Sequence, residues 1–403
     1  MKYLVPFLII ALAGCETKKS VMQNEVIYSD TIPGTFGYDR AFLKKYKNVI
    51  ELKAGDAKLL VVNDYQARVM TSTAGGDAGK SYGWMNYALI QSGELKPHMN
   101  AFGGEDRFWL GPEGGQYALY FKKGDPFDFD HWQTPALIDS ETFETVTADN
   151  TSATFKKPAT LTNYHGFTFQ FQIDRNVKLL TQPDVEKEFG IAINNIKAVA
   201  FQSTNSITNT GNENWSQKNG LLSIWILGMF IPSDKTVILL PYEKPQDEKQ
   251  VTDNYFGTIP ADRIRKTDSL LLLKGDGKFR GKVGVAPAIA KNIVGSYDQG
   301  NHILTLVKFD VDKKAPYVNS LWELQKEPFS GDVVNSYNDG PQADGSQMGP
   351  FYEIESSSPA KELKKGETLM HRHITLHLEG DETILNQIAE KTLGISLKNL
   401  SFQ

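Results

Sequence analysis

Short β-strand patterns recur along almost the whole chain, and no other feature constrains its fold as strongly. From about residue 26 to residue 378, runs rich in β-branched and aromatic residues alternate with clusters of Gly, Asn, Asp and Pro. Such runs are typical of strands bounded by turns. Helical periodicity is confined to residues 383–393 and a short piece at 184–189. Clear examples of the strand runs are residues 58–62, 116–121, 167–171, 236–240 and 302–307.

Consecutive strands without intervening helices pair antiparallel, because parallel pairing needs a crossover connection that is usually helical. We therefore expect an all-β fold, a large antiparallel two-sheet β-sandwich with few short helices. No linker rich in Pro, Ser or Gly divides the chain, so residues 26–403 are expected to form a single domain. The hydrophobic content of 40% and charged content of 23% are ordinary for a globular protein.

The N-terminus has the layout of an export signal. Lys2 precedes an apolar run at residues 4–11, and Leu-Ala-Gly-Cys follows at residues 12–15. The run is too short to span a bilayer, and small residues before a cysteine are typical of a cleavage site. The ending resembles the lipobox of bacterial lipoproteins, in which the cysteine is lipidated. We expect a signal peptide at residues 1–14, lipidation of Cys15, and a polar tether at residues 15–25 that joins the protein to a membrane of the cell envelope.

Cys15 is the only cysteine, so the mature domain is expected to lack both disulfides and a thiol nucleophile. The net charge is −5 and there is no long run of Lys and Arg, which argues against a nucleic-acid partner. Carboxylate and imidazole side chains are then the main candidates for chemistry.

Residues 351–355 and 370–378 carry the most informative polar pattern. Side chains alternate between the two faces of a strand, so Glu353 and Glu355 share one face of the first segment. If the two segments pair as neighbouring strands, these carboxylates lie on one polar face together with imidazoles of the second segment. The imidazoles that share one face of the second segment are those of His371, His373 and His377.

Such a face allows three interpretations. A carboxylate near an imidazole can transfer protons, which makes Glu353, Glu355, His371 and His373 catalytic candidates, with His377 as a substrate-binding candidate. His371 and His373 together with a carboxylate could also bind a divalent metal; no other cofactor is expected. The third interpretation is a solvated polar face without chemistry, which antiparallel sheets commonly present.

Residues 100–116 gather acids, an arginine and a tryptophan among glycines. Glycines permit tight turns, arginine and carboxylates hydrogen-bond polyols, and tryptophan offers a stacking surface. The spacing fits neither the dinucleotide-binding nor the phosphate-loop motif. A turn held by a local Arg–carboxylate pair is the alternative. The substrate-binding candidates in this segment are Glu105, Arg107, Trp109 and Glu113.

Residues 333–341 end in Asn-Asp-Gly-Pro, which is first of all a turn signal. Asn335 and Tyr337 share a strand face before that turn, and they are further substrate-binding candidates. The alternative is a turn without a ligand. Trp322 is expected in the core.

Two segments resemble the aldose 1-epimerase (galactose mutarotase) superfamily. Residues 206–215, with the sequence Ser-Ile-Thr-Asn-Thr-Gly-Asn-Glu-Asn-Trp, resemble a strand-turn segment of those proteins. Glu353-x-Glu355, followed by Leu-Lys-Lys-Gly-Glu-Thr at residues 363–368, resembles their late carboxylate and closing strand. The glycine-rich block 103–115 resembles an uncharacterised family of lipoproteins related to that superfamily.

The resemblance implies a galactose mutarotase-like β-supersandwich with a carbohydrate site on its concave face. In the mutarotases a glutamate acts as base and a histidine as acid, and Glu353 or Glu355 matches the glutamate. The histidine is expected in or near residues 222–230, where this chain has none.

We therefore expect a lipid-anchored protein that interacts with a carbohydrate. If it is an enzyme, a carboxylate acts as general acid or base in epimerisation, glycoside hydrolysis or elimination. One alternative is a non-catalytic glycan-binding or scaffolding lipoprotein, which the missing histidine favours. The other is a metal-dependent hydrolase or lyase that uses the histidine-rich strand.

Overall fold

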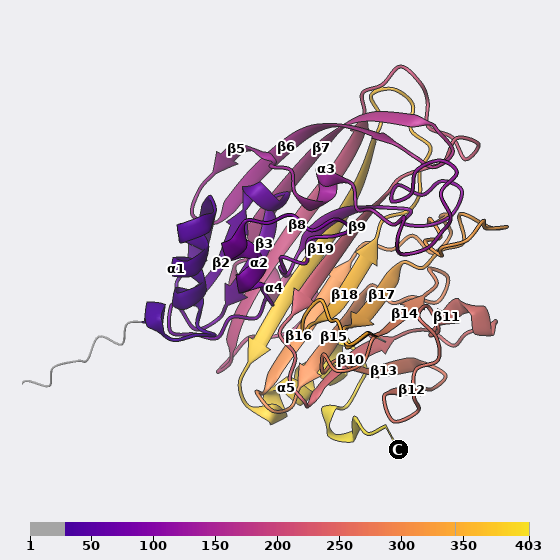
Figure 1. Ribbon diagram of the computed structural model, residues 1–403. Coiled ribbons are helices and arrows are strands. Elements are labelled where there is room, and N and C mark those ends of the chain that lie inside the picture. The colour runs from indigo at the N-terminus through magenta and orange to yellow at the C-terminus, as the bar shows by residue number, and fades with distance from the viewer. Residues whose placement is uncertain (1–28, 343, 403) are drawn as a thin grey trace, which may run out of the picture.

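The computed structural model describes residues 29–342 and 344–402 (Figure 1). The expected signal peptide, the lipidation site Cys15 and the tether lie outside these residues. Within the described part of the chain, no helix is long and apolar enough to cross a membrane.

The larger of two main sheets has ten antiparallel strands in the order β12-β13-β10-β15-β16-β19-β8-β7-β6-β5. The long strands are consecutive neighbours toward the β5 edge of this sheet, and Figure 1 shows them running side by side. These long strands are β6 (Ser152–Thr162), β7 (Thr168–Leu179), β8 (Lys197–Asn209) and β19 (Thr368–Glu379). The shorter strands are β5 (Glu144–Ala148), β10 (Thr236–Pro241), β12 (Ile264–Lys266), β13 (Leu270–Lys274), β15 (Ile293–Asp298) and β16 (Ile303–Phe309).

The second main sheet has six antiparallel strands in the order β11-β14-β17-β18-β9-β4. These strands are β4 (Arg107–Gly111), β9 (Ser223–Phe230), β11 (Val251–Thr252), β14 (Gly281–Val285), β17 (Val334–Asn338) and β18 (Tyr352–Ser357). A third sheet, which the sequence did not predict, consists of β1 (Val49–Ala54), β2 (Ala57–Val62) and β3 (Arg68–Thr73). A bridge from Val69 to Asp106 joins this small sheet to the segment that leads into β4.

Residues 29–342 and 344–402 contain five short α-helices that flank the sheets, and both predicted helices are among them. The last begins after Asp381, whose side chain accepts hydrogen bonds from the backbone N–H groups of Thr383 and Ile384. Its buried residues pack with those of β10, β16 and β19, and so cover the outer face of the ten-stranded sheet there. The helices are α1 (Phe36–Tyr46), α2 (Tyr87–Ser92), α3 (Ala136–Asp139), α4 (Gln182–Phe189) and α5 (Glu382–Thr392).

The predicted all-β, antiparallel two-sheet architecture is confirmed. Phe155 and Phe171 of the larger sheet belong to one buried cluster with Phe108 and Ile224 of the smaller sheet. The apolar residues of this cluster form the core between the layers, and their removal from water is the main stabilising contribution.

The expected pairing between the two polar C-terminal strands is wrong. The strand that carries Glu353, β18, pairs with β17 and β9, whereas β19, which carries His371, pairs with β16 and β8 in the other sheet. The apolar side of β19, with Leu376 and Leu378, faces the helices outside the sheet. Its polar side therefore faces the interior between the sheets, where it is buried rather than solvated.

Candidate functional site

A cavity lies on the face of the six-stranded sheet that is turned away from the ten-stranded sheet. It consists of two adjoining parts, of about 250 and 290 Å³, which share a set of lining residues, and we call it the sheet cavity. The shared lining residues are Glu113, Phe129, Trp225, Phe256, Arg280, Lys282, Trp322 and Gln342.

Strand alternation explains how neighbouring strands supply the floor of this cavity. Arg107 and Trp109 of β4 lie on the same face as Trp225 of β9, because Trp109 and Trp225 are cross-strand partners. In the same way Glu353 of β18 lies on the face of Tyr337 of β17, its partner in the ladder. Side chains from strands far apart in sequence thus converge on one cavity.

Two buried ion pairs cross the cavity floor. Arg107 donates to Glu353, and both side chains are almost fully buried. Lys282 Nζ lies 3.0 Å from Glu355 Oε2, and the indole N–H of Trp225 donates to the same oxygen over 3.0 Å. Glu355 itself is fully buried beneath these two side chains, and its other oxygen, Oε1, has no hydrogen-bond partner among the described residues.

Burial shifts the proton affinities of these groups. It raises the pKa of Glu353 to about 7, against the opposing effect of the Arg107 charge. Burial also raises the pKa of Glu113, which Lys282 partly opposes. For Lys282, burial lowers the pKa, but the charges of Glu355 and Glu113 outweigh it and raise the pKa above its ordinary value. Two carboxyl groups with raised pKa values thus lie beside a lysine that stays charged.

Aromatic rings form much of the cavity wall. Trp109 and Trp225 meet edge to face at 5.6 Å, and Trp132 stacks on Trp322 at 5.8 Å. Phe129, by contrast, remains 50% exposed. The indoles of Trp132 and Trp322 lie against the Glu113 carboxyl group, whereas the indole N–H of Trp109 is buried and, within the described chain, has no hydrogen-bond partner. Buried donors of this kind are rare and call for a partner such as water or a ligand.

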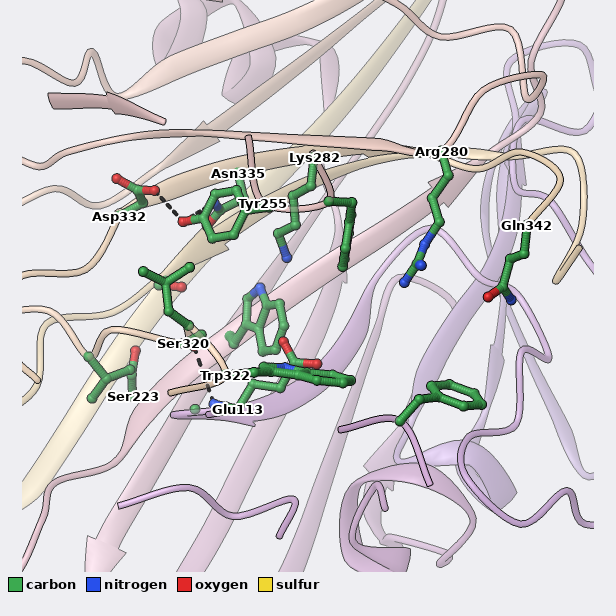
Figure 2. A pocket seen from close by; sticks show the side chains of 17 residues that line it. Glu113, Ser223, Tyr255, Arg280, Lys282, Ser320, Trp322, Asp332, Asn335 and Gln342 are labelled. Atoms are coloured by element: carbon green, nitrogen blue, oxygen red, sulfur yellow. Dashed lines mark hydrogen bonds between the residues drawn. The ribbon is translucent and has the colours of Figure 1, made fainter. Parts of the chain in front are cut away.

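Figure 2 shows one end of the cavity, where Lys282 and Arg280 point toward Trp322 and Glu113. Behind them Tyr255 donates a hydrogen bond to Asp332, whose pKa burial raises to about 6. At the far end of the cavity lies His98, whose Nδ1 is 2.6 Å from the backbone oxygen of Trp132.

The structure brings several sequence-predicted residues together and separates others. The predicted residues that line the cavity are Arg107, Trp109, Glu113, Asn335, Tyr337 and Glu353. Glu355 lies next to the cavity, under Trp225 and Lys282. The remaining predicted residues, Glu105, His371, His373 and His377, lie in the interior between the two sheets.

The three interior histidines form buried hydrogen bonds. Ser356 Oγ lies 2.8 Å from His371 Nε2 and 2.8 Å from His373 Nδ1. Burial lowers the pKa of His371 to about 3 and that of His373 to about 4, so both are neutral near pH 7. His377 Nε2 lies 2.9 Å from Glu105 Oε2. The expectation that these imidazoles share a face with Glu353 is therefore wrong, because Ser356 occupies the opposite side of β18.

The proposed metal ligands His371 and His373 both contact the Ser356 hydroxyl in this interior layer, and the charges of Asp106 and Arg175 act on His373. Across residues 29–342 and 344–402, no group of three or more His, Cys, Asp or Glu side chains is placed to hold a metal ion.

The sequence did not predict several of the side chains that line the cavity. Trp322 was expected in the core but lines both parts of the cavity. Lys282 and Trp225 lie on strands with few exposed positions, so polarity does not mark which face meets a ligand. Phe129 and Trp132 reach the cavity from a loop, and no local pattern predicts that position.

The Slr1438 protein from Synechocystis sp. PCC 6803 shares 11% identity, with a TM-score of 0.50 over 83% of this chain and 96% of that chain. A putative aldose 1-epimerase from Escherichia coli K12 shares 12% identity, with a TM-score of 0.46 over 82% and 99% of the two chains. A galactose mutarotase-like protein from Lactobacillus casei ATCC 334 shares 10% identity, with a TM-score of 0.48 over 82% and 99%.

The predicted likeness to aldose 1-epimerase and galactose mutarotase-like proteins is thus found among solved structures, and it concerns the fold alone. No curated protein matches the chain. A family model does match, over residues 34–402, and its description is a family of unknown function. Because the match spans nearly the whole described domain, the chain belongs to this family of unknown function, DUF6786.

Proposed function

We propose that the protein binds a carbohydrate in the sheet cavity. The observation that carries this proposal is the cavity wall, in which the buried indole N–H of Trp109 has no hydrogen-bond partner among the described residues and lies next to the Arg107–Glu353 pair. Sugar rings stack their apolar faces on aromatic side chains, and their hydroxyl groups exchange hydrogen bonds with carboxylates, guanidinium and indole N–H groups. A polyol would satisfy both kinds of surface at once.

We propose further that Glu353 exchanges a proton with the bound sugar. A carboxyl group with a pKa of about 7 has both protonation states available near neutral pH, which suits general acid–base catalysis. Arg107 holds this carboxyl in place through its ion pair. Glu113 is the second carboxyl group in the cavity, and Glu355 positions Lys282. The reaction classes compatible with this set are epimerisation, glycoside hydrolysis and elimination.

A second candidate is glycan binding without turnover. It is favoured by the two ion pairs, because Arg107 and Lys282 engage the carboxyl groups of Glu353 and Glu355. The Arg107 charge opposes the rise in pKa that burial causes in Glu353, and so makes Glu353 a weaker base than it would be without this ion pair. The β19 histidines lie in the interior between the sheets and cannot contact a sugar in the sheet cavity, which also favours glycan binding without turnover.

The two candidates are separated by the isosteric variant Glu353→Gln. Wild type, the variant and the control Glu390→Gln, an exposed position on α5, are tested by calorimetry against a panel of neutral and acidic oligosaccharides. Products are then analysed chromatographically. Binding in all three proteins with product only in wild type and control supports the enzyme. Binding without product in any protein, after prolonged incubation, supports the glycan-binding protein. If no sugar binds the wild type, the carbohydrate proposal fails.

We also propose that the protein is anchored in the cell envelope by a lipid on Cys15, facing the periplasm or the outer membrane surface. The support is the signal-like sequence of residues 1–15. Radioactive palmitate supplied to an expressing bacterium should label the wild type, which should partition with membranes. Cys15→Ser should be unlabelled. Equal labelling of both proteins, or of neither, contradicts the anchor.

A further inference from the structure

Arg280 is the one cavity-lining guanidinium without an ion pair among the described residues. It directly precedes β14 and, two residues before Lys282, lies on the same face. It contacts the cavity in both of its parts. Its Nε is buried without a hydrogen-bond partner, and no carboxylate pairs with it in the described chain.

Phe256 holds this guanidinium in place. The Arg280 Cζ lies 4.0 Å from the centre of the Phe256 ring, and that ring is itself 45% exposed at the cavity. Stacking on an aromatic ring fixes the plane of a guanidinium but leaves its N–H edge free. Figure 2 shows the side chain directed into the cavity beside Lys282. Its donors are therefore oriented before any ligand arrives.

No carboxyl group that lines the cavity forms an ion pair with Arg280 among the described residues. Arg107 pairs with Glu353, and Lys282 pairs with Glu355. Glu113 and Asp332 are the other carboxyl groups of the lining. Burial raises the pKa of both, and Asp332 accepts a hydrogen bond from Tyr255. Arg280 thus offers an anionic ligand group a guanidinium that no carboxylate of the described residues engages.

We propose that the cavity takes an acidic sugar, whose carboxylate or sulfate group is bound by Arg280. A guanidinium presents two parallel N–H groups that match the oxygens of such an anion. The aromatic wall would hold the ring that carries the acidic group. This inference rests on the proposed carbohydrate function and narrows its ligand to one charge class.

Matched pairs of oligosaccharides test this inference on the full-length domain by calorimetry. The first pair is trigalacturonate and its carboxyl-reduced neutral form, and the second is a κ-carrageenan tetrasaccharide and its desulfated form. Because hydrogen bonds to charged groups contribute about 1.5–3 kcal/mol, the acidic member of at least one pair should bind about 10- to 100-fold more tightly. Which pair shows the preference identifies carboxylate or sulfate.

Two variants connect the preference to Arg280. Arg280→Gln should lower the ratio of acidic to neutral affinity to about one. Lys278→Gln, a matched loss of charge at an exposed residue that pairs with Asp234, should leave the ratio unchanged. An unchanged ratio in Arg280→Gln, or equal affinities for both members of each pair in wild type, overturns the inference but leaves carbohydrate binding standing. If neither member of any pair binds, the proposed function fails as well.

Discussion

The buried histidine pair should make the free energy of unfolding depend on pH, and the size of this dependence can be calculated. His371 and His373 are fully buried, and their pKa values are lowered from 6.5 to about 3 and about 4. The unfolded chain therefore binds two protons between these values and pH 6.5 that the folded chain does not bind. The free energy of unfolding should fall as the pH drops below 6.5, and the fall should continue toward the folded pKa values.

The size of this loss of stability follows from the two histidine pKa shifts. Between pH 7 and pH 5, linkage gives a loss of about 2 kcal/mol for each histidine and about 4 kcal/mol for the pair. Glu353 works in the opposite direction, because its raised pKa means that the folded chain binds a proton as the pH falls through about 7. The wild-type curve alone is therefore not diagnostic, and a comparison with a variant is required.

The perturbation is the double substitution His371→Gln and His373→Asn. Glutamine places its amide near the Nε2 position and asparagine near the Nδ1 position, so each can keep the hydrogen bond to Ser356 without titrating. Urea unfolding of both proteins, followed by tryptophan fluorescence at pH 7, 6 and 5, gives the two stabilities. Other titrating groups cancel in the difference between them.

The wild type should lose about 4 kcal/mol more than the double variant between pH 7 and pH 5. Nuclear magnetic resonance of histidine-labelled wild type should also show two imidazoles that stay neutral down to pH 5. Parallel pH curves for the two proteins, or seven imidazoles that all titrate near pH 6.5, would refute the placement of these residues in the interior.

Three further predictions concern the cavity and the core. Phe129→Ala removes a half-exposed ring from the cavity and should weaken sugar binding by about 10-fold. The control Ile231→Ala, at a similarly exposed residue outside the cavity, should leave the affinity unchanged. Calorimetry compares the two variants, and equal losses of affinity would count against the cavity as the binding site. Arg175→Met leaves the buried Asp106 charge without its ion-pair partner and should lower the free energy of unfolding by about 3–5 kcal/mol. Urea titrations measure this loss, and a change below about 1 kcal/mol would contradict the prediction. Glu113→Gln should become more stable relative to wild type as the pH rises through the raised Glu113 pKa, because the variant has no buried carboxyl group to ionise. Thermal unfolding midpoints of both proteins at pH 5 and pH 8 check this. A difference between the two midpoints that does not change with pH would speak against it.

Local patterns predicted the architecture well, because strand periodicity and turn residues act over a few residues. Alternation also placed Glu353 and Glu355 on one face, and their shared side of β18 is the side that faces the cavity and its floor. The same rule placed Arg107 and Trp109 together correctly. Which side chains share one face of a strand is a property of that strand alone, so it can be predicted from a single sequence.

Relations between strands were not predictable in the same way. β18 and β19 are consecutive in sequence, yet they belong to different sheets. Alternation shows that His371 and His377 share a face, but it does not show whether that face meets solvent or a second sheet. Lys282, which pairs with Glu355, comes from a strand about seventy residues away in sequence. Only the three-dimensional arrangement of the two layers reveals such partners.

A crystal structure of the protein with a bound oligosaccharide tests the central claim most directly. The compound is the tightest-binding member of the panel described above. We predict a sugar ring against Trp225 or Trp322, with a hydroxyl group within hydrogen-bond distance of Glu353 and an acidic substituent on Arg280. A sugar seated elsewhere, for example in the neighbouring groove that residues 247–254 help to line, would contradict the account.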